Sequence, residues 1–310
     1  MQAQPLPMPS PALDRHEARG LWLGLLGVAI FAVTTPMTRL AVGDAAAPQL
    51  SPLFVTAGRA ALAGLLSALY LGFTRAPRPQ RAQWRDFAIT AAGVVVGFPL
   101  LLALALREVP AVHAAVVTGV LPLGTAVVGA LVLRQRPGAG FWLCALAGCA
   151  LVLGYAAWQG GGALVPADAW LLAAVASASV SYVYGARLSI VLRPEHVICW
   201  VLVGTLPLSL PVALWAASNT DFAAVRPGAW LGFGYVALFS MWLGFFAWYR
   251  GLALGGTLRV SQVQLLQPFL SLLAAVPLLG ETLDLPTVAF ALAVIATVFI
   301  GKRMPVRVRA

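Results

Sequence analysis

The sequence predicts an all-α integral membrane protein with ten transmembrane helices, arranged as two inverted five-helix repeats around a central cavity. Three observations predict this fold. The chain is 61% hydrophobic and 10% charged, with a mean hydropathy of +0.89, which is more apolar surface than one soluble core can bury. The apolar residues fall in ten long runs, and the second half of the chain repeats features of the first. Because each repeat has an odd number of spans, the second is expected upside down in the bilayer.

Each apolar run is long enough to cross roughly 30 Å of hydrocarbon as a helix. A transmembrane β-strand needs only about ten residues of alternating polarity, and these runs are about twice as long and apolar on every side. The first run is also too long for the core of a signal peptide, which is typically about 7 to 15 residues, so it counts as the first helix. In chain order, the predicted helices cover residues 20–42, 51–73, 86–106, 111–133, 139–157, 168–190, 196–217, 228–249, 257–279 and 285–301.

The duplication is visible in the sequence itself. Trp22-Leu23 recurs 148 residues later as Trp170-Leu171, and Pro122 recurs 146 residues later as Pro268. The repeat predicts five segments along the chain. These are a disordered cytoplasmic tail (1–19), a first five-helix repeat (20–157), a linker (158–167), a second five-helix repeat (168–302) and a basic cytoplasmic tail (303–310).

The basic residues predict the orientation, because Arg and Lys are retained in cytoplasmic loops. Apart from Arg59, which lies inside a span, only Arg39, Arg107 and Arg226 fall on one side, and the other sixteen of the 20 basic residues fall on the other. Both termini are therefore expected in the cytoplasm. Topology also explains the net charge of +10, so no nucleic-acid partner is expected. Nineteen of the basic residues are arginine and alanine is abundant, which favours a bacterial plasma (inner) membrane protein.

Short motifs in three predicted helices carry a resemblance to a known family. Pro36 to Leu40 in the first helix, Gly58 to Leu65 in the second and Leu278 to Glu281 at the end of the ninth, together with the two copies, resemble the EamA-type branch of the drug/metabolite transporter superfamily. The resemblance covers nearly the whole chain after residue 20. It implies an exporter of small metabolites through a central cavity, and amino-acid exporters, including aromatic ones, are among the members. The first copy differs, because Arg134-Gln135 stands where the second has Gly280-Glu281, so no role that needs an acid in both copies is expected.

The eighth predicted helix carries a stripe of aromatic residues. Their spacing of 4, 3, 4 and 3 places all five rings on one helical face. Ordinary packing between helices accounts for such a stripe, and so does the wall of a pocket for apolar or aromatic solutes. Trp242 and Phe246 lie nearest the middle of the span and are the predicted substrate contacts. The five residues are Tyr235, Phe239, Trp242, Phe246 and Tyr249.

The ninth predicted helix supplies the polar counterpart. Gln264, Gln267 and Ser271 share one face, and Pro268 leaves the carbonyl of Gln264 without its usual helical partner. One interpretation is a hydrogen bond between helices. The alternative is that the free carbonyl and the amides bind the ammonium group of a zwitterion.

Other polar and aromatic residues extend this predicted site over helices one, three, four, six, eight and nine, an assignment that draws partly on the resemblance. Serine and threonine hydroxyls also satisfy themselves on their own helix, so each alone is weak evidence. The further predicted substrate contacts are Tyr182, Thr35, Phe98 and Thr118. The predicted helix bends or hinges are at Pro36, Pro99, Pro122 and Pro268.

Charged and titratable residues inside the predicted spans are few. Arg59 is a candidate partner for a substrate carboxylate, but it lies about two turns from the outer end of its helix, and snorkelling favours a structural role. His113 is expected to be a neutral interfacial histidine rather than a proton relay. Since every acid is assigned to a loop or a span end, facilitated diffusion or exchange by alternating access is the simpler mechanism.

Other function classes fit the sequence less well. No His-Glu-x-x-His or GxSxG motif occurs, so no enzymatic activity is expected. The three cysteines fall within spans without Cys-x-x-Cys spacing, and neither a metal nor a cofactor is expected. The expected partners are a small-molecule substrate, such as an amino acid or related metabolite, and the lipid bilayer. The alternatives are an exporter of drugs or lipophilic cations, and a membrane sensor or scaffold that transports nothing.

Overall fold

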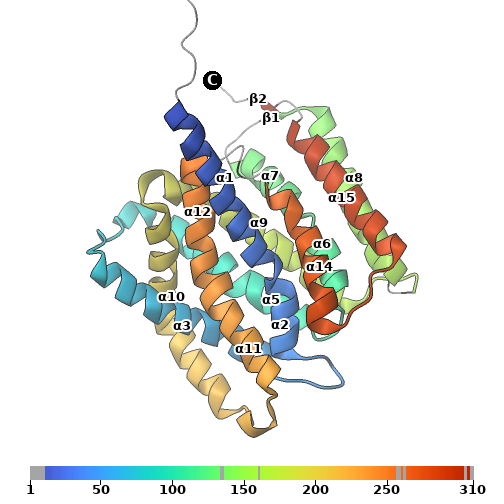
Figure 1. The fold of residues 1–310 in the computed structure, drawn as a ribbon, viewed down its shortest axis with the longest axis horizontal. Coiled ribbons are helices and arrows are strands. Elements are labelled where there is room, and N and C mark those ends of the chain that lie inside the picture. Colours follow the sequence, from blue (N-terminus) through green and yellow to red (C-terminus); the bar gives the residue numbers. More distant parts are fainter. Residues whose placement is uncertain are drawn as a thin grey trace, which may run out of the picture.

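The protein is an all-helical bundle in the computed structural model, which describes residues 11–132, 136–159, 161–255, 260, 263–303 and 306–307 (Figure 1). Eight helical spans are long and apolar enough to cross a membrane, and two shorter apolar helices, Gln264–Leu279 and Leu285–Gly301, follow them. We number these spans 1 to 10 in chain order. The all-α membrane fold is confirmed, and the described residues add only a two-residue antiparallel strand pair and an isolated β-bridge between Gly43 and Pro48.

Several spans consist of two to four helical segments in sequence. The first repeat contains α1 (Pro11–Ala32) and α2 (Thr34–Val42) in span 1, α3 (Pro52–Phe73) in span 2, η1 (Arg81–Gln83), α4 (Trp84–Thr90), η2 (Ala91–Gly97) and α5 (Phe98–Ala105) in span 3, α6 (Ala111–Thr118) and α7 (Leu121–Val132) in span 4, then β1 (Arg136–Pro137), and α8 (Ala139–Gln159) as span 5. The second repeat contains α9 (Pro166–Val191) as span 6, α10 (Pro194–Ser218) as span 7, then η3 (Phe222–Ala224), α11 (Pro227–Tyr235), η4 (Val236–Leu243) and α12 (Gly244–Gly255) in span 8, η5 (Gln264–Leu266) and α14 (Gln267–Leu279) in span 9, α15 (Leu285–Arg303) as span 10, and β2 (Val306–Arg307).

The first helix starts earlier than the sequence predicts. Residues 11–19, expected in a disordered tail, form the first turns of α1. Pro11 has a backbone angle suited to a first helical turn, and alanine, leucine, glutamate and arginine, all good helix formers, follow it. Residues 1–10 lie outside the described residues, and so does most of the predicted start of the ninth helix, at 257–259 and 261–262.

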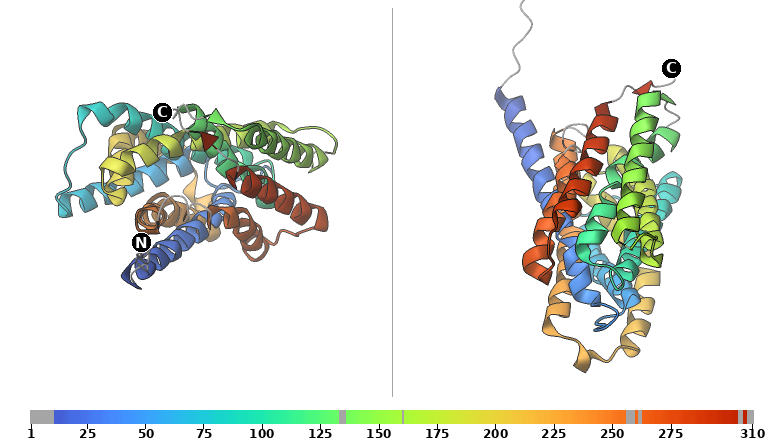
Figure 2. Two further views of the ribbon diagram at one scale, coloured as in Figure 1. Left: turned by 90° about the horizontal axis from the view of Figure 1, so that it is seen from above. Right: turned by 90° about the vertical axis from the view of Figure 1, so that its right-hand side faces the viewer.

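The two repeats pair through a twofold relation. Span 2 packs against span 7, span 4 against span 9 and span 5 against span 10, while span 1 packs against span 8 and span 3 against span 6. The first three pairs join equivalent spans of the two repeats. In the last two pairs, the first span of each repeat packs against the third span of the other, as a twofold axis requires. The second repeat is inverted, since α1 begins and α15 ends at the same face of the molecule (Figure 2). We call this face the terminal face and the opposite one the distal face.

Helices are interrupted beside all four prolines named above. Span 1 breaks at Val33 before Pro36, and span 4 breaks between α6 and α7 before Pro122. A π-helical segment precedes Pro99, and the 3-10 segment η5 precedes Pro268. A proline has no backbone N–H and clashes with the preceding turn, so the regular hydrogen-bond ladder stops there.

Both third spans of the repeats contain a π-helical segment. Ala91–Gly97 in span 3 and Val236–Leu243 in span 8 begin 145 residues apart, close to the repeat offset of the sequence. In span 3, Gly93 and Gly97 bring this segment so close to α9 that a β-carbon on either would collide with a serine of α9. Small residues allow such close approach of two helices. Span 3 and span 6 therefore form one tightly packed wall beside the centre.

Candidate functional site

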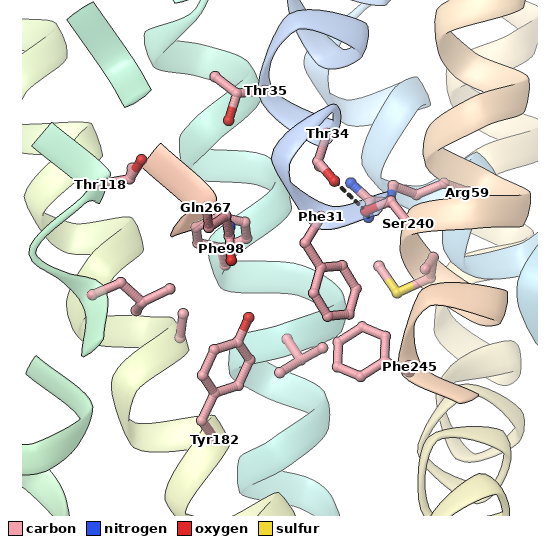
Figure 3. Close-up of a pocket in the computed structure, with 14 residues that line it drawn as sticks. Phe31, Thr34, Thr35, Arg59, Phe98, Thr118, Tyr182, Ser240, Phe245 and Gln267 are labelled. Atoms are coloured by element: carbon pink, nitrogen blue, oxygen red, sulfur yellow. Dashed lines mark hydrogen bonds between the residues drawn. The ribbon is translucent and has the colours of Figure 1, made fainter. Parts of the chain in front are cut away.

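A cavity of about 580 Å³ of empty space lies between spans of both repeats. Spans 1, 2, 3, 4, 6, 8 and 9 line it, and the described residues of spans 5 and 10 do not. Figure 3 shows its wall, with hydroxyls, an amide and a guanidinium around a ring-lined interior. The lining residues are Phe31, Thr34, Thr35, Arg59, Val94, Phe98, Thr118, Leu121, Ala178, Tyr182, Ser240, Met241, Phe245 and Gln267.

A smaller hollow of about 270 Å³ continues from this cavity between the two fourth spans. It shares Thr118, Leu121 and Gln267 with the cavity and adds Gln264 and Ser271 to its wall. The structure thus brings together seven of the nine predicted contacts. These are Thr35, Phe98, Thr118, Tyr182, Gln264, Gln267 and Ser271.

Arg59 is the one charged side chain among the residues that line the cavity. It is only 3% exposed, its Nη2 donates to Ser240 Oγ at 3.1 Å, and Thr34 Oγ1 donates to the same oxygen at 2.8 Å. Its Nε has no hydrogen-bond partner, and no ion pair to Arg59 occurs among the described residues. Snorkelling to the membrane surface, the structural role that the sequence favours, therefore does not describe this side chain.

A buried guanidinium without a counter-ion is costly. Moving an ion from water into the protein interior costs roughly several kcal/mol, unless a partner of opposite charge compensates for the lost hydration. The described lining residues of both hollows include no Asp or Glu, so the cavity wall has a net positive charge. The arrangement can therefore bind an anionic group, with a fork of donors that matches a carboxylate.

The second hollow offers acceptors instead. Pro122 and Pro268 occupy equivalent positions in the two fourth spans, and neither can donate to the carbonyl four residues earlier, at Thr118 and Gln264. The Gln264 carbonyl instead accepts from Gln267 N within η5, so Pro268 does not leave it free as the sequence predicts, and the Thr118 carbonyl is the acceptor that remains. The Thr118 hydroxyl donates to Ala114 O at 2.7 Å, so it is already satisfied within its own helix. Backbone carbonyls at a helix break are good partners for a cation or an ammonium group.

Ser271 holds two helices together rather than facing the hollow with a free hydroxyl. Its Oγ donates to Ala32 O at 2.6 Å, which is the carbonyl left without a helical partner by Pro36. The amide of Gln267, in contrast, points into the cavity (Figure 3).

Trp242 and Phe246 do not reach the cavity, which corrects the sequence prediction. Both rings pack on Tyr70 of span 2, with centroids 6.4 Å and 5.0 Å away. From the same span, Ser240, Met241 and Phe245 line the cavity instead.

The reason for this correction is the π-helical segment η4. Its wider turn, with bonds from residue i to i+5, breaks the 3.6-residue period on which the predicted aromatic stripe rests. Phe239 and Tyr235 stack on one another, and the Tyr235 hydroxyl donates to Ile30 O at 2.9 Å. The stripe therefore does not form one wall, and Ser240, a polar residue within an apolar run, was the signal available in the sequence.

Phenylalanine rings nevertheless border the cavity. Phe31 of span 1 and Phe245 of span 8 have centroids 5.0 Å apart, and Phe98 of span 3 and Tyr182 of span 6 contribute further rings to the wall (Figure 3). Such rings offer large apolar contact to aromatic or aliphatic groups.

His113 and Asp168 form a buried pair that the sequence did not predict. Nε2 of His113 lies 2.7 Å from Oδ1 of Asp168, and the two side chains are only 4% and 2% exposed. Oδ2 of Asp168 also accepts from Val165 N at 2.9 Å and so caps the start of α9. The pair ties span 4 to span 6 away from the lining of the cavity. No cluster of three potential metal ligands occurs in the described part of the chain.

Comparisons with known proteins agree with this geometry. The sequence profile of the EamA-like transporter family matches residues 18–156 and again residues 165–301. The uncharacterized transporter YdeK of Bacillus subtilis (strain 168) is 44% identical over 283 residues, which cover 91% of this chain and 96% of YdeK. A protein crystal structure superposes with a TM-score of 0.61 over 92% of this chain and 96% of its own length, and at 21% identity it supports the fold alone.

Proposed function

This chain belongs to the EamA-like transporter family, and from that premise we propose that it exports amino acids, aromatic ones included, across the bacterial plasma membrane. The solute would sit in the central cavity between the two inverted repeats. Alternating access would follow from rocking of one group of spans against the other.

The observation that carries this proposal is the unpaired guanidinium of Arg59 in the cavity wall. Ser240 occupies one of its nitrogens, while its Nε has no partner. A substrate carboxylate would compensate the buried positive charge. A solute without an anionic group would leave the cost of that burial unrelieved.

The rest of the wall suits the other parts of an amino acid. The Thr118 carbonyl, to which Pro122 cannot donate, and the amide oxygen of Gln267 can accept an ammonium group. Phe98 and Phe245 provide apolar contact for a side chain, aromatic or aliphatic. A zwitterion would find partners for both of its charges.

An exporter of lipophilic cations is the main alternative. The rings that line the cavity favour it, because cations bind aromatic faces. The positive charge of Arg59 opposes it, since two cations about 7 Å apart repel by about 2 kcal/mol at an effective dielectric of about 20. A sensor or scaffold without transport is the second alternative, and solute flux distinguishes it.

No carboxylate lines either hollow among the described residues, so the proposed mechanism is facilitated diffusion or exchange. Purified protein in liposomes should then take up radiolabelled amino acid without an imposed proton or sodium gradient. Strict dependence on such a gradient would contradict this mechanism while leaving the substrate class intact.

The substrate test compares phenylalanine with two relatives that each lack one charged group. Phenylethylamine lacks the carboxylate, and 3-phenylpropionate lacks the ammonium group. We expect phenylalanine to be transported best and phenylethylamine worst, with Phe, Tyr, Trp, Leu, Thr and Met all tested beside a lipophilic cation. Preference for phenylethylamine or the lipophilic cation would refute the proposal, and absence of flux for every solute would favour a sensor.

The proposed orientation places the terminal face in the cytoplasm, as the basic residues predict. Arg78 is exposed in the loop after span 2, at the terminal face, and Asn219 is exposed directly after span 7, at the distal face. In intact cells, a membrane-impermeant thiol reagent should label Asn219→Cys and leave Arg78→Cys unlabelled. The reverse pattern would invert the orientation.

A further inference from the structure

Glu281 makes a contact between the two repeats that the transport site does not use. The residue follows Gly280, whose left-handed backbone (φ 69°) ends α14 and turns the chain. Its Oε1 accepts from Ala111 N at 2.8 Å and its Oε2 accepts from Val112 N at 2.7 Å. Both carboxylate oxygens of the second repeat therefore bind the first two backbone N–H groups of α6 in the first repeat.

The contact stabilises both partners. The first N–H groups of a helix have no intrahelical acceptor, and the positive end of the helix dipole favours an anion. Hydrogen bonds to a charged acceptor are roughly twice as strong as neutral ones. Glu281 and Pro110 also belong to the wall of a hollow on the distal face, so the contact lies at the mouth of the molecule there.

Each side of this contact is fixed to a different group of helices. The His113–Asp168 hydrogen bond ties α6 to α9, whereas the hydrogen bond from Ser271 to Ala32 ties α14 to α1. The contact of Glu281 with α6 therefore joins these two groups at the distal face. Any movement that separates the groups at this face must break it.

We propose that Glu281 is a latch that holds the distal face closed and is released whenever the transporter opens there. This inference rests on the proposed alternating access and adds the contact that controls it. The latch is a carboxylate docked on the start of a helix in the opposite repeat, and it needs no bound solute.

The sequence provides a carboxylate at this position in the second repeat only. At the repeat offset of 146 residues, Glu281 corresponds to Gln135, which has no negative charge. A glutamine at that position cannot supply a carboxylate latch of this kind. Without solute, molecules with a closed distal face should therefore outnumber molecules that are open at that face.

The test measures opening directly, without solute. Spin labels are attached to cysteines that replace Glu108 and Thr282, two exposed residues beside the two sides of the latch, after the three native cysteines have been replaced by serine. Double electron–electron resonance spectroscopy of the protein in liposomes then gives the distribution of distances between the two spin labels. Glu281→Gln should raise the ratio of open to closed populations roughly 10- to 100-fold, because the amide has one acceptor oxygen and turns an NH₂ group toward a backbone N–H.

Asp284→Asn is the matched control. Asp284 lies three residues further along the same loop, where its Oδ1 accepts from Thr287 N at 2.9 Å, and the hydrogen bonds from Thr287 lower the pKa of its carboxyl group. It caps α15 in its own repeat, and it makes no direct hydrogen bond to the first repeat among the described residues, so its substitution should leave the distance distribution unchanged. Glu281→Asp, which keeps the charge on a side chain one methylene shorter, should fall between wild type and Glu281→Gln.

The outcomes separate this inference from the proposed substrate. A wild-type distribution for Glu281→Gln, or an equal shift for Asp284→Asn, would overturn the latch whatever the protein transports. A larger shift for Glu281→Asp than for Glu281→Gln would overturn it as well, and this comparison remains decisive if the glutamine variant is obtained in low yield. A shifted distribution in a protein that rejects every amino acid would keep the latch and refute the substrate class.

Discussion

Replacing Arg59 by glutamine should change the binding of two kinds of solute in opposite directions. The side chain lies in the cavity wall, 3% exposed, with Ser240 as its hydrogen-bond partner and no acid paired with it among the described residues. Glutamine keeps a polar group of similar length and removes the charge. The change therefore tests electrostatics more than packing.

The magnitude follows from the geometry. A carboxylate about 4 Å from the guanidinium gains about 4 kcal/mol at an effective dielectric of about 20. Desolvation of the solute offsets part of this gain, and losing one partner of a buried charge pair typically costs about 2 to 5 kcal/mol. We expect a loss of about 3 kcal/mol for phenylalanine, which is roughly a 150-fold higher dissociation constant. A lipophilic cation about 7 Å away should bind up to roughly 50-fold more tightly, because about 2.4 kcal/mol of repulsion disappears.

The assay is equilibrium binding of both solutes to purified protein, with flux in liposomes as a second measurement. Arg59→Lys should keep the rejection of the cation but lose part of the carboxylate affinity, since lysine cannot form the fork of an arginine. Arg78→Gln, which removes an exposed charge in a loop, is the control and should change neither. Weaker binding of both solutes to Arg59→Gln would indicate a damaged cavity, and unchanged binding of both would refute the role of this charge.

Three other residues give further predictions. Ser240→Ala removes the hydroxyl that holds Arg59, so phenylalanine affinity should fall roughly tenfold while yield of folded protein changes little. Phe245→Ala should weaken binding of aromatic amino acids by roughly ten- to 100-fold. Trp242 lies outside the cavity, so Trp242→Phe should change binding by no more than roughly a factor of two. Equal effects of the two substitutions would indicate that both rings serve only helix packing. Gly93→Ala forces a β-carbon into α9 and should lower the free energy of unfolding by about 1 to 3 kcal/mol, seen as a lower melting temperature in detergent. Gly72 has open space around it, so Gly72→Ala should leave the melting temperature unchanged. Equal melting temperatures of the two variants would contradict the close packing of span 3 against α9.

Predictions that depend on counting along the chain succeeded. The number, order and all-helical character of the spans follow from apolar runs, because a bilayer leaves backbone groups no partner outside a helix or a closed barrel. The inverted repeat follows from parity and from the offset that relates Pro122 to Pro268. The profile match to residues 18–156 and 165–301 confirms the duplication.

Predictions that depend on helical phase were less secure. The polar residues predicted in spans 4 and 9 lie at the second hollow, because the described parts of these spans are interrupted only next to the prolines that the sequence shows. The aromatic stripe of span 8 was wrong at Trp242 and Phe246, because the π-helical turn of η4 shifts the face by a fraction of a turn. Nothing in local composition marks that turn.

The class of the protein, its ten spans and their inversion can be predicted from the amino-acid sequence alone, since hydrophobic length and repeat parity are local or additive properties. Which side chains meet depends on the folded arrangement of the helices. Arg59 joins Ser240 across 181 positions, Asp168 joins His113 across 55, and Glu281 reaches Ala111 across 170. Such contacts depend on how helices cross and on where their regular turns are interrupted, and no single segment of the chain encodes either one.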